Sequence, residues 1–247
     1  MSPQTMTLPP VVGHRGAKGH APENTLASIA MAARLGVRWV EFDTKLSRDG
    51  HVVVFHDDEV DRTTNGAGLI GDMDLAEIQT LDAGSWFGDE FAGEGVPTLV
   101  QAMKALDQLG LGANVEIKPS KGLEEESGRV VASMLNNQWP RFLPPPLISS
   151  FSAEALAAAR ATAPAMERAL LVLDVPGDWR SLMSQLGCSA LHCVVRSTTP
   201  GLVREVLAEG WAFRCFTVNS KRKAEKLFCL GVETVYSDYP ERIVSGL

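Results

Sequence analysis

Residues 11–25 have the sequence VVGHRGAKGHAPENT, in which a short apolar segment leads directly into a histidine, an arginine and a glycine. Adjacent valines are typical of a buried strand. A helical pattern begins after Asn24 or Thr25, either of which can cap the N-terminus of the helix. A strand that ends in charged residues just before a helix predicts one unit of an α/β fold, with those residues at the open end of the sheet.

The same strand and helix unit recurs along the chain. The predicted strands cover residues 11–14, 39–43, 114–118, 147–151, 168–173, 190–194, 213–218 and 234–238. The helical patterns between them end at glycines that favour a left-handed C-cap, namely Gly36, Gly110, Gly187, Gly210 and Gly231. Eight such units predict a TIM (β/α)8 barrel, a fold of about 250 residues. A doubly wound open sheet is the structural alternative.

Residues 44–96 are too long for a simple connection between a strand and its helix. Asp49-Gly50 predicts a two-residue hairpin turn, which would pair His56 directly with Asp43 and fold it back over the open end. Residues 57–96 are rich in glycine and aspartate, and we expect them to form a small inserted subdomain. Residues 1–247 are otherwise expected to form a single barrel domain.

The composition favours a small-molecule partner. The net charge is −7, and the chain has no extended basic cluster, which argues against nucleic acid and against stable association with an anionic membrane. The N-terminal residues show no signal-peptide pattern, so we expect a cytoplasmic protein. We expect the cysteines to be buried free thiols: Cys188, Cys193, Cys215 and Cys229. The oligomeric state is left open.

Two predicted strands carry carboxylates at alternate positions. Glu41 and Asp43 share one face of their strand, and Glu116 and Lys118 share one face of the next barrel strand. Buried neighbouring carboxylates repel one another, and a divalent cation removes that repulsion. Ligation by oxygen atoms alone suits Mg²⁺ or Ca²⁺, with Glu116 as the third ligand and Lys118 free for an anionic substrate. The structural alternative is a set of ion pairs at the strand ends.

Two histidines are predicted to meet at the same open end. His14 ends the first strand and His56 follows the hairpin, and such a pair can supply a general base and a general acid near neutral pH. Arg15 can bind phosphate oxygens through its planar guanidinium. A packed or capping role is the alternative for a histidine in such a position, and we expect that structural role for the other three, His20, His51 and His192.

Several segments occur in a characteristic order: GHRG (13–16), PENT (22–25), EFDTKLSRDGHVVVFHD (41–57), DRTTNGAG (61–68), VPTL (96–99), VEIK (115–118), FTVN (216–219) and YSDYP (236–240). With these segments the chain resembles the glycerophosphodiester phosphodiesterases, in particular their short bacterial cytoplasmic type. The resemblance implies a TIM barrel with a small insertion after the second strand. It also implies hydrolysis of glycerophosphodiesters to sn-glycerol 3-phosphate and an alcohol, with a divalent metal.

The same resemblance implies roles for individual residues. It places the catalytic histidines at His14 and His56, and the metal ligands at Glu41, Asp43 and Glu116. The remaining members would contact the phosphate or line the pocket: Arg15, Lys118, Phe151 and Asn219. The chain departs from the common pattern at Gln101, Phe216 and Ser237, and Phe216 bears on the shape of the alcohol pocket.

Two other functions compete with this hypothesis. A lipid phosphodiesterase of the lysophospholipase D or sphingomyelinase D type would need an apolar rim, for which the insertion offers only Trp86, Phe87 and Phe91. A non-catalytic phosphodiester-binding barrel would usually lack one of the histidines or carboxylates, whereas this chain has all of them. The residues leave several points undecided: the alcohol headgroup, Mg²⁺ against Ca²⁺, the assignment of acid and base, and direct attack by water against a cyclic phosphate.

Overall fold

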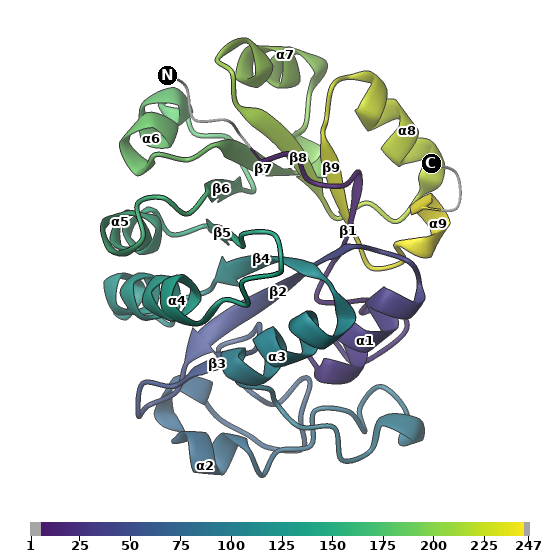
Figure 1. The fold of residues 1–247 in the computed structure, drawn as a ribbon, viewed down its shortest axis with the longest axis vertical. Helices are drawn as coiled ribbons and strands as arrows, with labels where there is room; N and C mark the ends of the chain where they lie inside the picture. Colours follow the sequence, from purple (N-terminus) through teal and green to yellow (C-terminus); the bar gives the residue numbers. More distant parts are fainter. Residues whose placement is uncertain (1–5, 245–247) are drawn as a thin grey trace.

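Eight parallel strands close into a barrel in the computed structural model, which describes residues 6–244 (Figure 1). The first five residues of the N-terminal stretch discussed above lie outside the described part. The barrel strands are β1 (Val11–Gly13), β2 (Trp39–Leu46), β4 (Gly112–Ile117), β5 (Leu147–Ser150), β6 (Arg168–Val172), β7 (Ala190–Val194), β8 (Ala212–Phe216) and β9 (Thr234–Ser237). Pairing of β1 with both β2 and β9 closes the sheet. The predicted TIM barrel is therefore confirmed, and the open sheet is wrong.

Helices follow the strands and cover the outside of the barrel (Figure 1). They are α1 (Leu26–Arg34), α3 (Leu99–Leu109), α4 (Glu124–Gln138), α5 (Ala153–Thr162), α6 (Trp179–Leu186), α7 (Pro200–Ala208), α8 (Lys221–Cys229) and α9 (Glu241–Val244). Thr25 rather than Asn24 caps α1, because its side chain accepts a hydrogen bond from the Ser28 amide. All five glycines expected to end helical patterns have positive φ angles, between 60° and 98°.

A hairpin extends β2 beyond the barrel, as expected, but its register differs from the prediction. In β3 (Val52–Val54), Val54 pairs with Thr44 and Val52 with Leu46, so Asp43 faces Phe55 rather than His56. The cause is the turn, in which the Ser47 amide donates to the His51 carbonyl around a three-residue loop with Gly50 at φ 79°. His56 lies just beyond the paired residues, where the chain turns back toward the barrel.

Residues 57–96 lie beside α3 and the hairpin, at the bottom of the view in Figure 1. They contain two short 3₁₀ turns, Ile70–Asp72 and Asp89–Phe91, and one short helix, α2 (Leu75–Ile78). With β3 and Phe55 they form an apolar cluster that is separate from the cluster between barrel and helices: Val53, Phe55, Val60, Ile70, Ile78, Ala83 and Val96. This packing holds the segment beside the carboxyl ends of β2 and β4.

Apolar side chains and one ion pair, between Glu233 and the buried Arg214, lie toward the amino-terminal ends of the barrel strands. Leu8, Val12, Trp39, Leu147 and Tyr236 belong to the cluster there. A second group of charged side chains lies at the carboxyl ends of the strands, which is where TIM barrels carry their active sites. Within residues 6–244, no helix has both the length and the apolar composition needed to cross a membrane.

The cysteines are free, and the prediction of burial holds for three of the four. Cys188, Cys193 and Cys215 are buried, whereas Cys229 is exposed. Cys229 is the last residue of α8, and a residue at a helix end is only partly covered by the neighbouring elements. Among the histidines expected to be structural, His192 is buried beside Arg214 and Tyr236.

Candidate active site

The GHRG segment forms a tight loop between β1 and α1. A side chain at Gly13 would approach the Gly16 carbonyl oxygen to 2.2 Å, and one at Gly16 would meet Ser28. Arg15 lies between them in the left-handed region at φ 49°, a conformation that costs a non-glycine residue free energy. Its amide donates to Glu41 Oε2 at 2.8 Å and its carbonyl accepts from Ser28 Oγ at 2.7 Å. These bonds compensate for the strain and aim His14 and Arg15 at the barrel opening.

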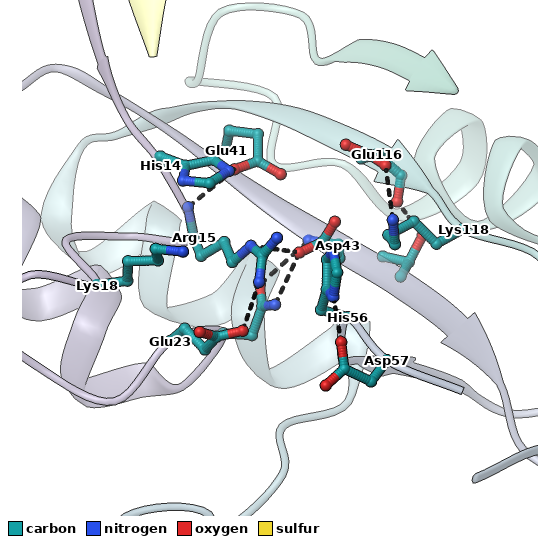
Figure 2. A network of polar contacts seen from close by, with 12 residues as sticks. His14, Arg15, Lys18, Glu23, Glu41, Asp43, His56, Asp57, Glu116 and Lys118 are labelled. Carbon is teal, nitrogen blue, oxygen red and sulfur yellow. Dashed lines mark hydrogen bonds and ion pairs between the residues drawn. The ribbon is translucent and has the colours of Figure 1, made fainter. Parts of the chain in front are cut away.

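Three buried carboxylates converge at the carboxyl ends of β2 and β4 (Figure 2). Asp43 pairs in register with Glu116 across the two strands, and Glu41 lies two residues earlier on the same face of β2. One oxygen of each residue lies within 4.8 Å of the other two. Burial and the neighbouring carboxylates raise the pKa of Glu41 well above its ordinary value, and burial together with Asp43 raises the pKa of Glu116 to about 8.

Buried oxygens without a hydrogen-bond donor indicate that this group suits a divalent cation. Oε1 of Glu41 and Oε1 of Glu116 are buried and accept no hydrogen bond from the described residues. Lys118 Nζ lies 3.4 Å from Glu116 Oε1. Asp43 Oδ2 is held by Asn24 Nδ2 at 2.8 Å and lies 3.3 Å from Arg15 Nε. The carboxyl groups of these three residues lie close enough together to hold a divalent cation.

His14 is held by a carboxylate that follows the last barrel strand. Its Nδ1 lies 2.6 Å from Asp238 Oδ1, and its Nε2 lies 3.9 Å from Glu41 Oε2. Although burial opposes it, the hydrogen bond with His14 lowers the pKa of Asp238, so the aspartate accepts and Nδ1 donates. Burial lowers the pKa of His14 despite this bond. The ring therefore presents an unprotonated Nε2 toward the carboxylates.

His56 has the same arrangement on the other side of the carboxylates. Its Nδ1 bonds to the Asp57 carboxylate, so its Nε2 is likewise left for another partner (Figure 2). Burial lowers the pKa of His56, although the nearby Asp43 opposes the change. Hydrogen bonds from Arg62 and His56 outweigh burial and lower the pKa of Asp57 to about 2. The structure thus brings the two histidines, each oriented by an aspartate, to one place.

A cavity of about 610 Å³ lies above the carboxylates. It is lined by His14, Arg15, Lys18, His56, Glu116, Lys118, Phe151, Leu173, Val194, Phe216 and Thr217. Phe151 stands edge-on to Phe216 with ring centroids 5.9 Å apart, and Lys118 Nζ lies 5.6 Å from the centre of the Phe151 ring. A second cavity of about 560 Å³ shares His56, Lys118 and Phe151 with the first.

Asn219 was expected to line the pocket, but it lies behind His14 and outside the lining of this cavity. Its Nδ2 donates to Asp238 Oδ2 at 2.9 Å, and its Oδ1 accepts from the Asp238 amide at 2.8 Å. Ser237 Oγ, at a position where the sequence departs from the family pattern, donates to the same Oδ1 at 3.1 Å. Asn219 therefore contacts the carboxylate that orients His14. Gln101 is another position at which the sequence departs from the family pattern. Its side chain forms a capping box with Thr98 at the start of α3.

Several residues of the site were missed by sequence reasoning. They are Lys18, Glu23, Asn24, Asp57, Arg62 and Asp238. Asp57 follows His56 directly, and Glu23, Arg62 and Asp238 belong to the segments PENT, DRTTNGAG and YSDYP, which were singled out without assigning these residues a role. Their position in those segments was the one signal that could have pointed to them. The sequence around each residue did not show which partner it would contact.

Comparisons with known proteins agree with this geometry. The pattern of the glycerophosphoryl diester phosphodiesterase family matches residues 14–242. A glycerophosphodiester phosphodiesterase of Caldanaerobacter subterraneus subsp. tengcongensis is 33% identical over 240 residues, covering 95% of this chain and 96% of that protein. A phosphodiesterase of Oleispira antarctica, solved in complex with the product sn-glycerol 3-phosphate, is 44% identical with a TM-score of 0.93, and the match covers 96% of each chain. A glycerophosphodiester phosphodiesterase of Agrobacterium tumefaciens is 29% identical with a TM-score of 0.80, covering 97% of this chain and 100% of that chain.

Proposed function

The chain belongs to the glycerophosphoryl diester phosphodiesterase family, and we propose that it hydrolyses glycerophosphodiesters to sn-glycerol 3-phosphate and an alcohol by metal-dependent, two-histidine catalysis. One observation carries the proposal: His14 and His56, each with Nδ1 held by an aspartate, flank three converging carboxylates beneath a cavity. The product bound to the Oleispira antarctica relative supports the same choice of product here.

We assign the cation to Glu41, Asp43 and Glu116, with Mg²⁺ or Ca²⁺ as the ion. When bound, a divalent cation neutralises charge on the phosphodiester and makes the phosphorus more electrophilic. The protein's own contribution is a set of fixed oxygens, since the register of β2 with β4 and the bonds from Arg15 and Asn24 hold the carboxylates in place.

Arg15 and Lys118 are assigned to the phosphate oxygens. Both line the cavity, and they lie next to the carboxylates that the cation would neutralise. Arg15 Nη1 is occupied by Glu23 Oε1 at 2.5 Å, which fixes the direction of the guanidinium. Lys118 Nζ lies 3.4 Å from Glu116 Oε1 and would be free to bind a phosphate oxygen if Glu116 held a cation instead.

The histidines are assigned to the two proton transfers. One unprotonated Nε2 accepts the proton of the attacking hydroxyl as its oxygen forms a bond to phosphorus. The other imidazole, protonated, gives its Nε2 proton to the alcohol oxygen as the bond from that oxygen to phosphorus breaks. The attacking hydroxyl belongs either to water or to the substrate's glycerol, and in the second case a cyclic phosphate forms and is then opened by water. A ³¹P spectrum recorded during turnover distinguishes these routes, because the cyclic ester has its own resonance.

Alanine variants of the two histidines test the proposal. General acid or base catalysis is worth about 10²–10⁴-fold, so His14→Ala and His56→Ala should each lower kcat for glycerophosphocholine by at least about 10²-fold. The double variant should be little worse than the poorer single one, because groups that act together are not additive. His51→Ala is the matched control, since His51 is exposed at the hairpin turn. Near-normal turnover by either site variant would refute the two-histidine mechanism.

A diester with a nitrophenol leaving group separates the two roles. This leaving group departs without a proton, so the variant that lacks the general acid should recover much of its rate. The variant that lacks the base should remain slow. Equal behaviour of the two variants would contradict the division of roles.

A further inference from the structure

We propose that Arg62, from the inserted residues 57–96, is a positioning residue that holds both His56 and Arg15 in their working orientations. Its guanidinium bonds to two carboxylates at once. Nε donates to Asp57 Oδ2 at 2.5 Å, while Nη2 and Nη1 donate to Glu23 Oε1 and Oε2 at 2.7 and 3.1 Å. The inference rests on the proposed function, in which His56 transfers a proton and Arg15 binds phosphate.

Each carboxylate held by Arg62 in turn holds a residue of the cavity. The second oxygen of Asp57 bonds to His56 Nδ1, and Glu23 Oε1 also accepts from Arg15 Nη1 at 2.5 Å (Figure 2). A continuous chain of ion pairs therefore runs from His56 through Arg62 to Arg15. Its members come from two separate parts of the chain, the loop between β1 and α1 and the segment after β3.

The charges in this chain are balanced only when Arg62 is present. Glu23 is 7% exposed, and hydrogen bonds from Arg62 and Arg15 outweigh its burial and lower its pKa to about 2. A guanidinium suits this position because its planar fork can bond to two carboxylates in fixed directions, which a lysine ammonium does not reproduce. Without Arg62, Asp57 would lose the bond to Oδ2 that keeps its Oδ1 directed at His56. Glu23 would then have Arg15 as its one remaining cationic partner among the described residues.

Stability and catalysis should respond differently to the loss of Arg62. The Arg62 side chain is 47% exposed, and ion pairs this exposed contribute little to the free energy of unfolding. A misdirected catalytic histidine, by contrast, costs activity heavily, because partners that orient such a group are typically worth about 10–100-fold. If Arg62 had only a structural role, its loss would instead lower the melting temperature and leave kcat and KM unchanged.

Arg62→Ala is the test, with Arg48→Ala as the matched control. Arg48 is 53% exposed and also bonds to two carboxylates, Asp74 at 2.7 Å and Glu77 at 3.1 Å, so it ties the hairpin to the same inserted segment without approaching the cavity. Arg62→Ala should lower kcat about 10–100-fold through His56 and raise KM through Arg15. Asp57→Asn should lower kcat alone, because Glu23 and Arg15 keep their partner.

The tautomer of His56 gives a readout that needs no turnover. ¹⁵N spectra of the folded wild type should show His56 protonated at Nδ1, as its bond to Asp57 requires. In Arg62→Ala the population should shift toward protonation at Nε2, and in Arg48→Ala it should not. Because these spectra need no substrate, they test the bridge even if the wild type hydrolyses no glycerophosphodiester, a result that would refute the proposed function alone.

Kinetics and spectra of Arg62→Ala that match those of Arg48→Ala would overturn the proposal. If Arg62→Ala does not fold, Arg62→Lys replaces it, because a single ammonium keeps the charge without bridging both carboxylates. Arg62→Lys should then show a lower kcat, a higher KM or both. If its kcat and its KM both equal those of the wild type, the bridge is not needed and the proposal is wrong.

Discussion

Replacing Glu41 with glutamine should stabilise the metal-free protein, and the gain should grow with pH. The three carboxylates lie within 4.8 Å of one another, and burial together with Asp43 and Glu116 raises the pKa of Glu41. The folded state therefore binds a proton that the unfolded state releases above the ordinary glutamate pKa of 4.5, so stability falls as pH rises. Glutamine keeps an oxygen for the Arg15 amide and has no charge to lose.

The size of the gain can be bounded in two ways. Two unit charges within 4.8 Å repel by roughly 3 kcal/mol at an effective dielectric constant of about 20. Keeping a proton at pH 8 on a carboxyl whose ordinary pKa is 4.5 costs roughly 5 kcal/mol, which is an upper limit to the penalty. A weaker bond from Arg15 to the neutral amide offsets about 1 kcal/mol. We therefore expect Glu41→Gln to raise the free energy of unfolding by about 1–3 kcal/mol near pH 8, and to leave it unchanged near pH 4.

Thermal unfolding after chelation measures this effect. For a chain of this size each kcal/mol moves Tm by about 2–4 °C, so Glu41→Gln should melt roughly 5 °C above the wild type near pH 8. The control is Glu225→Gln, an exposed glutamate within α8. Excess Mg²⁺ or Ca²⁺ should reverse the order, because the wild type and the control keep all three carboxylates and gain about 2.7 kcal/mol at 100 times Kd, whereas Glu41→Gln has lost one of them. A metal-free Glu41→Gln that melts well below both other proteins would refute the reasoning and make Glu41 a structural partner of Arg15.

Three other outcomes are expected. A chelator should abolish glycerol 3-phosphate release and Mg²⁺ or Ca²⁺ should restore it; full activity in metal-free protein would contradict the assignment of the carboxylates. Asp238→Asn should lower kcat by about 10²-fold or more, because an amide does not fix the Nδ1–H tautomer of His14, and unchanged kinetics would remove Asp238 from the site. Deacylated diesters such as glycerophosphoethanolamine should be hydrolysed faster than lysophospholipids, because Arg15, Lys18 and Lys118 line the cavity beside the two histidines and because Trp86 and Phe87 of the insertion pack against each other. The opposite preference in a headgroup and acyl-chain panel would favour a lipid-acting enzyme.

The sequence by itself determined the units of the fold and the contents of its open end. Alternation along a strand requires Glu41 and Asp43 to share a face, and the same rule pairs Glu116 with Lys118. Glycines at the ends of helical patterns, such as Gly110, marked where each helix stops, because the left-handed region is costly for other residues. These are local properties, which a chain carries wherever its neighbours lie. The order of the characteristic segments from GHRG to YSDYP was enough to indicate the family.

Tertiary structure alone decided which residues meet. Asp238 reaches His14 from 224 positions away, because closure of the barrel sets β9 beside β1. Arg62 lies in the predicted inserted subdomain, where sequence reasoning assigned it no role, yet packing beside the barrel joins it to Glu23, which is 39 positions earlier in the chain. The hairpin register also depended on a backbone choice, a three-residue rather than a two-residue turn at Gly50, that the dipeptide does not specify. Local rules fix the direction of a side chain, whereas the partner in that direction depends on how distant segments close around it.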